Sequence, residues 1–202
     1  MRKRYSAYNI LITAGPTREF IDPVRFISNP STGIIGYLIA AYARKRRHKV
    51  ILLSGATHHK PLPGVKTLFF TSALDLKKLA GKYASWADCI ICAAAVGDFR
   101  PRRKVPYKIK KQNGFFNLLL EKNPDILEGL GKKKNNQILI GFALETGDMV
   151  QNGLKKLKDK NLDCIVVNEL SAKSNPFGQG LFNTFIIYIL KSACTASSNN
   201  KI

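Results

Sequence analysis

The sequence predicts an α/β protein: a Rossmann-like three-layer sandwich with a mostly parallel sheet. Short apolar runs rich in β-branched residues alternate with segments whose apolar residues recur at helical spacing. The expected strands are apolar almost throughout, which is typical of parallel strands buried on both faces. A length of 202 residues fits one domain. We therefore expect a single domain over residues 1–191, and a frayed polar tail over residues 192–202.

The first half of the chain predicts two β-α units. Residues 9–14 form an apolar run that ends at Gly15-Pro16, which predicts a strand. Residues 31–47 show helical periodicity and end in a run of four basic residues, which predicts a helix. Further strands are expected at 49–55 and 67–70. A helix over 72–84 is expected to begin at Ser72, because serine is a favoured N-cap residue.

The second half predicts further β-α units and a final strand. Its expected elements are a strand at 88–96, a hairpin strand at 115–120, a short helix after Asn123-Pro124-Asp125, a strand at 138–143, a helix at 148–160, and strands at 164–168 and 184–190. Ligands of such sheets bind outside the carboxyl ends of the strands. The loops after the 9–14, 88–96 and 138–143 strands are therefore expected to form the site.

The composition excludes disorder and indicates anionic partners. Hydrophobic residues make up 45% and charged residues 23%, close to the globular average. The 33 Lys and Arg residues outnumber the 13 Asp and Glu residues, and the formal charge is +20. Such a surface attracts nucleotides, phosphorylated metabolites and nucleic acid.

No export or membrane segment is expected. Residues 1–4 are basic, but the polar residues that follow replace the apolar core of a signal peptide. The longest apolar stretches, 33–43 and 89–96, are shorter than the ~18 residues that a membrane helix needs. We expect a cytoplasmic protein without membrane partners.

The cysteines are expected to be buried structural thiols. Cys89, Cys92, Cys164 and Cys194 lie mostly in apolar, β-like runs. Cys89 and Cys92 match C-x-x-C, but residues three apart on a strand point to opposite faces, and no second pair completes a zinc site.

Two segments predict phosphate binding. The 15–33 loop is long for a β-α connection and ends in Ser31-Thr32-Gly33-Ile34-Ile35-Gly36, where the amino end of a helix favours an anion. The alternative is that these small residues allow close helix-sheet packing. Between residues 100 and 111, seven of twelve positions are Lys or Arg and none is acidic, which suits a triphosphate or a solvated basic face.

Two other functions are considered. A dinucleotide-dependent reductase would carry an acidic residue after the second strand, where Ser54 to His59 stand instead. Tyr107-x-x-x-Lys111 has the spacing of short-chain reductases, but that pair requires a helix and here it follows Pro106 in an expected loop. His58 and His59 are interpreted as loop side chains. A nucleic-acid-binding module suits the charge, but only Tyr107 provides a stacking ring within the basic run.

Six motifs occur in register between about Asn9 and Asn168. They are Thr13-Ala14-Gly15-Pro16-Thr17-Arg18-Glu19, Asp22 to Asn29 with Ser31-Thr32-Gly33, Ala93 to Phe99, Lys108-Ile109-Lys110-Lys111, Asn123-Pro124-Asp125-Ile126, and Gly141 to Thr146. Together they resemble bacterial phosphopantothenate:cysteine ligases. The resemblance implies that 4'-phosphopantothenate is joined to cysteine in coenzyme A synthesis, with CTP and Mg²⁺, through an acyl-cytidylate. It also implies a homodimer and a flavin-dependent decarboxylase, here as a separate protein.

The resemblance further implies roles for individual residues. Asn29 is expected to hold the acyl-cytidylate, Lys108 to be the catalytic cation, and Arg25 to order the loop or bind the pantothenate phosphate, in its own or a neighbouring subunit. Asp98 is expected to bind the ribose or the metal, whose other ligands are unknown. The remaining expected nucleotide contacts are Gly15, Ser31, Gly33, Ala94, Ala95, Pro124, Asp125, Ile126, Leu127, Phe142, Lys156 and Lys160. The preference for CTP over ATP is left open.

Overall fold

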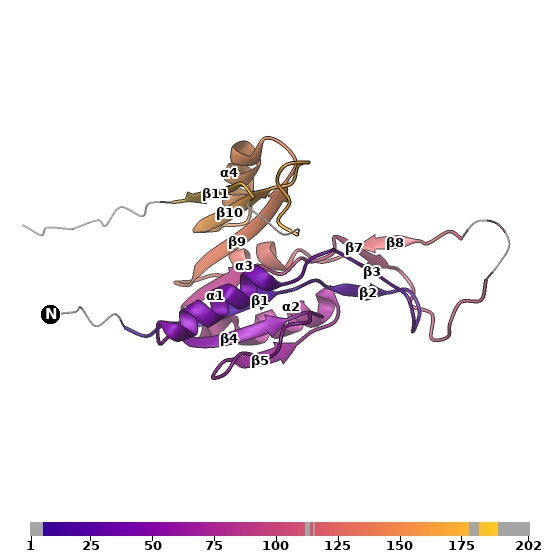
Figure 1. The fold of residues 1–202 in the computed structure, drawn as a ribbon, viewed down its shortest axis with the longest axis horizontal. Coiled ribbons are helices and arrows are strands. Elements are labelled where there is room, and N and C mark those ends of the chain that lie inside the picture. Colours follow the sequence, from indigo (N-terminus) through magenta and orange to yellow (C-terminus); the bar gives the residue numbers. More distant parts are fainter. Residues whose placement is uncertain (1–5, 112–113, 115, 178–181, 190–202) are drawn as a thin grey trace, which may run out of the picture.

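A seven-stranded sheet forms the centre of the molecule, in the order β11-β10-β9-β6-β1-β4-β5. The computed structural model describes residues 6–111, 114, 116–177 and 182–189. All neighbouring strands of the sheet are parallel except the β10–β11 pair. The sheet consists of β1 (Asn9–Ala14), β4 (Lys49–Ser54), β5 (Lys66–Phe69), β6 (Cys89–Cys92), β9 (Ile138–Glu145), β10 (Cys164–Glu169) and β11 (Thr184–Tyr188). These positions confirm the predicted, mostly parallel architecture (Figure 1).

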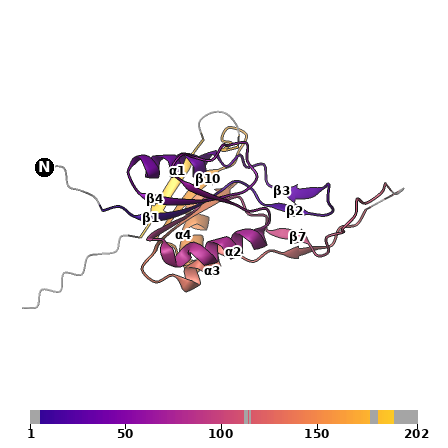
Figure 2. The same ribbon diagram turned by 90° about the horizontal axis from the view of Figure 1, so that it is seen from below.

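Helices lie on both faces of the sheet and make it the middle of three layers. The helices are α1 (Ile34–Lys45), α2 (Ala73–Tyr83), α3 (Ile126–Lys133) and α4 (Met149–Asp159), with a short 3₁₀ helix η1 (Ala84–Trp86) after α2. Figure 2 shows α1 on one face and α2, α3 and α4 on the other. One apolar core includes buried residues of α2, α3 and α4, and a second packs α1 on β1 and β4.

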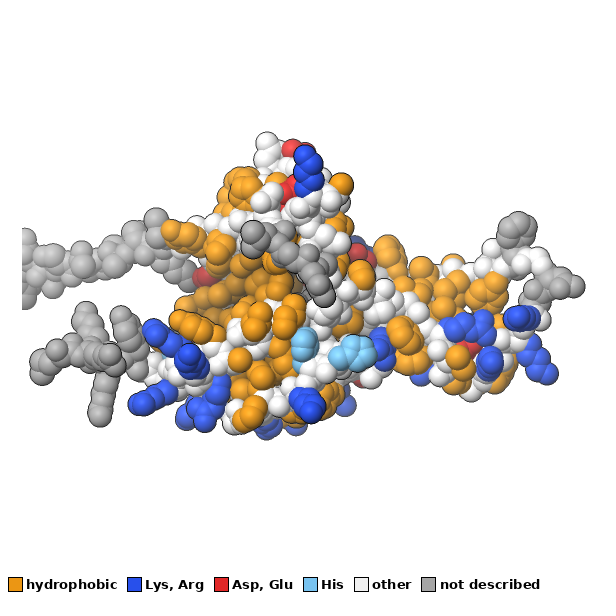
Figure 3. All heavy atoms as spheres, viewed as in Figure 1, with side chains coloured by type: hydrophobic (Ala, Val, Ile, Leu, Met, Phe, Trp, Pro, Cys, Tyr) orange, Lys and Arg blue, Asp and Glu red, His pale blue; other side chains and the backbone are white. Residues whose placement is uncertain are grey.

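The α1 face of the sheet is covered unevenly. Among the described residues, no helix covers β9, β10 and β11 on this side, and apolar side chains are visible between α1 and these strands (Figure 3). Leu38, Tyr42, Ile186 and Tyr188 are all more than 60% exposed. The expectation of helices on both faces therefore holds fully only for the β1 half of the sheet.

An arm of two small hairpins projects beyond the sheet. The long loop after β1 contains the antiparallel strands β2 (Arg18–Phe20) and β3 (Phe26–Ser28), and β7 (Phe99–Pro101) pairs with β8 (Leu120–Lys122). Figure 1 shows the two hairpins side by side, and the N–H of Val105 donates to the carbonyl of Ile21. We call residues 18–28 and the described residues of 99–122 the arm.

Several element boundaries differ from the sequence expectations. The expected strand at 88–96 ends at Cys92, because the chain then turns toward the loop after β1. The expected strand at 115–120 is replaced by β8 at 120–122; Phe115 lies outside the described residues. The predicted N-cap at Ser72 is confirmed, since its side chain accepts from the N–H of Asp75, and the structure adds a capping box with the Asp75 side chain. The 1–191 domain stays a prediction at its ends, because residues 1–5 and 190–202 also lie outside the described part.

Candidate functional site

A hollow of about 230 Å³ lies at the carboxyl ends of β1, β6 and β9. We call it the main pocket. Separate segments of the chain form its walls, and most of its lining comes from positions that the sequence motifs indicated. Its lining residues are Thr13, Leu76, Cys92, Ala94, Val96, Gly97, Asp98, Lys122, Asn123, Pro124, Asp125, Ile126, Leu127, Phe142 and Lys160. The structure thus brings together Ala94, Asp98, Pro124 to Leu127, Phe142 and Lys160, as expected.

Asn123 joins two walls of the main pocket. Its buried side-chain amide donates to the carbonyl of Gly97 (2.8 Å), and its Oδ1 accepts from Arg100 Nη1 (3.0 Å). Its backbone N–H donates to the carbonyl of Asp98 (2.8 Å). A buried amide satisfied in this way fixes the segments that it joins. Asn123 was not expected as a site residue; its only signal was its place in the Asn-Pro-Asp motif.

Asp125 and Lys160 set the charge at the floor of the main pocket. Asp125 caps α3 by accepting the N–H of Glu128 (2.9 Å), and its other oxygen pairs with Lys160 Nζ at 2.7 Å. Burial raises the pKa of Asp125, but these hydrogen bonds and the Lys160 charge outweigh it and hold the pKa below its usual value. The Asp125 carboxylate is therefore charged at neutral pH, and an incoming phosphate would compete with it for Lys160.

The Ala94-Ala95 segment meets the loop after β1. The N–H of Ala94 donates to Thr13 Oγ1 (3.0 Å), and the N–H of Ala95 donates to the carbonyl of Gly15 (3.0 Å). Both N–H groups are engaged within the chain, so any contact from this segment to a nucleotide must use other atoms. Gly15 therefore acts here as a partner of Ala95, at a backbone φ of +81° that favours glycine.

Asn29 lies between the main pocket and a second hollow. Its side-chain amide donates to the carbonyl of Val96 (3.3 Å), whose residue lines the main pocket. Asn29 and Ser31 also line the second hollow, of about 510 Å³, together with His58 and His59. Asn29 thus lines the second hollow and contacts a residue of the main pocket, at the position that the resemblance assigns to holding the acyl-cytidylate.

The Gly33-x-x-Gly36 segment is explained by packing. A Cβ on Gly36 would lie 2.5 Å from the Cβ of Ala14, and one on Gly33 would lie 2.8 Å from Thr57. The alternative interpretation of close helix-sheet contact is therefore sufficient for these two glycines. The N–H groups of Gly33 and Ile34 are bonded to Ser31 Oγ and Thr32 Oγ1, so phosphate binding here stays a prediction.

Besides Ala95 and the residues of the loop after β1 described above, three further expected site residues lie away from the main pocket. Lys156 Nζ pairs with Glu145 Oε1, and this ion pair joins helix α4 to strand β9. Arg25 and Lys108 lie on the arm, where Lys108 is exposed and Arg25 pairs with Asp22 (3.2 Å). For these three residues a role in binding or catalysis stays a prediction.

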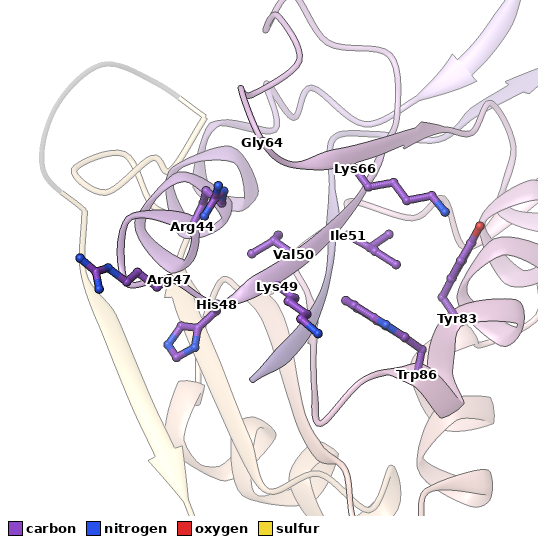
Figure 4. Close-up of a pocket in the computed structure, with 10 residues that line it drawn as sticks. All are labelled: Arg44, Arg47, His48, Lys49, Val50, Ile51, Gly64, Lys66, Tyr83 and Trp86. Atoms are coloured by element: carbon purple, nitrogen blue, oxygen red, sulfur yellow. The ribbon is translucent and has the colours of Figure 1, made fainter. Parts of the chain in front are cut away.

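A basic hollow lies near the opposite, amino end of β4. It is lined by Arg44, Arg47, His48, Lys49, Val50, Ile51, Gly64, Lys66, Tyr83 and Trp86. Figure 4 shows that Arg47 points away from Lys66 and Tyr83, and Lys66 Nζ lies 5.1 Å from the Tyr83 ring centre. These cations do not converge on a common point, which weakens the nucleic-acid alternative.

The remaining alternatives find little support in the described residues. Tyr107 and Lys111 lie outside any helix, so they do not form the reductase pair. Cys89 packs into the α1-side core and Cys92 into the opposite core, which confirms that they face opposite sides of β6. Burial raises the pKa of Cys89 to about 11 and that of Cys92 to about 12, so both are protonated, unreactive thiols. Cys194 lies outside the described part.

The described residues contain neither a metal-binding cluster nor a membrane-spanning helix. No group of three or more His, Cys, Asp or Glu side chains gathers to hold a metal ion within residues 6–111, 114, 116–177 and 182–189. In the same residues, none of the helices has the length and apolar character needed to cross a bilayer.

Comparison with known proteins places the chain in a family. Residues 5–201 match the family described as DNA/pantothenate metabolism flavoprotein C-terminal domain. The chain is 44% identical over 171 residues to the coenzyme A biosynthesis bifunctional protein CoaBC of Bacillus subtilis, covering 84% of this chain and 42% of that protein. The corresponding protein of Escherichia coli K12 is 39% identical over 173 residues, with coverages of 84% and 43%.

A solved structure shows the same fold. The crystal structure of the C-terminal domain of CoaBC is 42% identical and has a TM-score of 0.72, covering 80% of this chain and 76% of that one. The chain spans less than half the length of the two bifunctional relatives. The match over nearly the whole sequence and the shared fold show that this chain belongs to the DNA/pantothenate metabolism flavoprotein C-terminal domain family.

Proposed function

We propose that this chain is a phosphopantothenate–cysteine ligase, which joins 4'-phosphopantothenate to L-cysteine in coenzyme A biosynthesis. The observation that carries the proposal is the main pocket, in which motifs far apart in the sequence meet at the carboxyl ends of β1, β6 and β9. The relatives of this chain are named as coenzyme A biosynthesis proteins, which supports a role of the chain in that pathway. The proposed location is the cytoplasm, and a flavin-dependent decarboxylase that acts on the product is a further proposed partner.

The proposed reaction has two steps. The substrate carboxylate attacks the α-phosphate of CTP, which forms an acyl-cytidylate and releases pyrophosphate. The cysteine amine then attacks the activated carbonyl and releases CMP. Negative charge gathers in both steps, so preorganised cations and amide donors lower the barrier. Lys160 in the main pocket and Lys108 on the arm supply such charge, and Asn29 supplies an amide donor between the two hollows.

The described residues suit an Mg²⁺ ion that is bound together with the nucleotide phosphates. Mg²⁺ is usually held by one or two carboxylates together with substrate phosphates. Asp98 lines the main pocket and is the carboxylate proposed to hold it, because Asp125 is already paired with Lys160. The ion would neutralise phosphate charge when bound. CTP is the proposed nucleotide, and a comparison with ATP would test that choice.

A homodimer is also proposed, on the basis of the arm. Its exposed apolar side chains include Val24 at 56%, Tyr107 at 69% and Leu119 at 64%. An arm with such a surface suits a contact with a second copy of the chain. In a dimer, Arg25 and Lys108 of one copy could serve the pocket of the other.

The half-reactions provide the test of this function. With phosphopantothenate and CTP but no cysteine, the protein is expected to release pyrophosphate about once per site, because a pocket that excludes water protects the anhydride. Addition of cysteine is expected to restart the release. An ¹⁸O label in the substrate carboxylate is expected in CMP, because the oxygen that attacked phosphorus departs with it.

Two outcomes would contradict the proposal. Label found in free phosphate would indicate an acyl-phosphate route instead. An absence of pyrophosphate release with CTP and with ATP, at any cysteine concentration, would remove the ligase assignment.

A further inference from the structure

The arm contains a carboxylate that the proposed mechanism leaves unused. Asp22 has no solvent exposure, although it lies in the short turn between β2 and β3. A buried charge is costly unless hydrogen bonds and an opposite charge compensate it. The contacts of Asp22 therefore indicate what its burial achieves.

Asp22 binds two different segments of the arm. Its Oδ1 accepts the N–H groups of Val24 and Arg25, each at 2.8 Å, which closes its own turn. Its Oδ2 accepts the N–H of Ile109 at 3.1 Å and pairs with the Arg25 guanidinium at 3.2 Å. Burial raises the pKa of Asp22, but the three N–H groups and the Arg25 charge hold it below its usual value. The group is thus ionised at neutral pH.

Arg25 also binds the peptide group of Ile109. Its Nη2 donates to the carbonyl of Ile109, so the N–H and the carbonyl of Ile109 are both held by side chains of the β2–β3 turn. These partners are separated from Ile109 by 84 and 87 residues of sequence. Ile109 directly follows Lys108, whose own side chain is exposed. The backbone that carries Lys108 is therefore fixed while its ammonium group stays accessible.

We propose that Asp22 is a positioning residue for Lys108: with Arg25, it holds the peptide group of Ile109 and so fixes the backbone from which the Lys108 ammonium reaches the reacting phosphate, in the proposed dimer the phosphate in the pocket of the second copy. This inference rests on the proposed ligase function. It assigns Arg25 mainly to ordering the arm rather than to binding a phosphate. Misplacement of a catalytic cation by about 1 Å can cost on the order of 10²-fold in rate, which makes such a fixed backbone functionally significant.

The test combines substitution with a double-variant comparison. Asp22→Asn keeps the size of the side chain but removes the charge and turns one acceptor into a donor. We expect kcat for pyrophosphate release to fall about tenfold or more, with the KM for CTP within about twofold of wild type. In a Lys108→Gln background, Asp22→Asn is expected to cause no further loss, because residues that act as one unit are non-additive.

Hydrogen exchange gives a readout that does not depend on activity. The amide of Ile109 is expected to exchange on the order of 10-fold faster in Asp22→Asn than in wild type. Asp75→Asn is the matched control: Asp75 is another hydrogen-bonded aspartate, in the capping box of α2, and its loss should leave both kcat and Ile109 exchange unchanged. If Asp22→Asn does not fold, Arg25→Gln removes the guanidinium that holds the carbonyl of Ile109 and should lower kcat and speed the exchange of the Ile109 amide in the same way.

The outcomes separate this inference from the proposed function. An unchanged kcat in Asp22→Asn, or losses that multiply in the double variant, would overturn the positioning role even if the wild-type protein is an active ligase. A wild-type protein without ligase activity would remove the function, while the exchange of Ile109 would still test the contact.

Discussion

Replacement of Asn29 by aspartate is expected to abolish product formation, by at least about 10³-fold, while the fold stays intact. The Asn29 amide donates to the carbonyl of Val96 between the two hollows. A carboxylate there would lose this donor and would place a negative charge beside an incoming phosphate. Loss of a single donor to a developing oxyanion already costs on the order of 10²–10³-fold. Phosphopantothenoyl-cysteine formation, measured by mass spectrometry, checks this expectation.

Asn135→Asp is the matched control for this substitution. Asn135 is exposed between α3 and β9, so the same added charge there should leave turnover close to wild type. Near-wild-type turnover in Asn29→Asp would mean that Asn29 does not hold the intermediate.

Replacement of Lys108 by glutamine is expected to lower kcat by on the order of 10²-fold or more, with a modest effect on the KM for CTP. A cation that stabilises charge appearing only in the transition state contributes to kcat rather than to nucleotide binding. Initial rates of pyrophosphate release over a range of CTP concentrations separate the two parameters.

Arg102→Gln and Lys104→Gln provide the comparison within the same basic segment. Both residues are exposed, and Lys104 Nζ lies 5.2 Å from the centre of the Phe20 ring, so its charge stays on the arm. Activity should change little in either variant. An equal loss at all three positions would show that the segment acts only as a diffuse positive field, without a specific role for Lys108.

The sequence alone was sufficient to predict the seven strands of the sheet, because short apolar runs rich in β-branched residues and bounded by turn residues are typical of buried strands. It also indicated the loops that form the main pocket, since the carboxyl ends of parallel strands meet at one edge. The cap at Ser72 and the helix start at Asp125 were predictable as well, because capping depends on residues only three positions apart.

The tertiary structure decided the features that depend on contacts between distant segments. Strands β2 and β3 have three residues each, too few for a periodic pattern, and they form only as part of the arm. Lys156 and Lys160 are one helical turn apart, yet Lys156 pairs with Glu145 while Lys160 reaches the main pocket with Asp125. The burial of Asp22 against Ile109 likewise has no local signal, because its partner lies 87 residues away and only folding brings the two together.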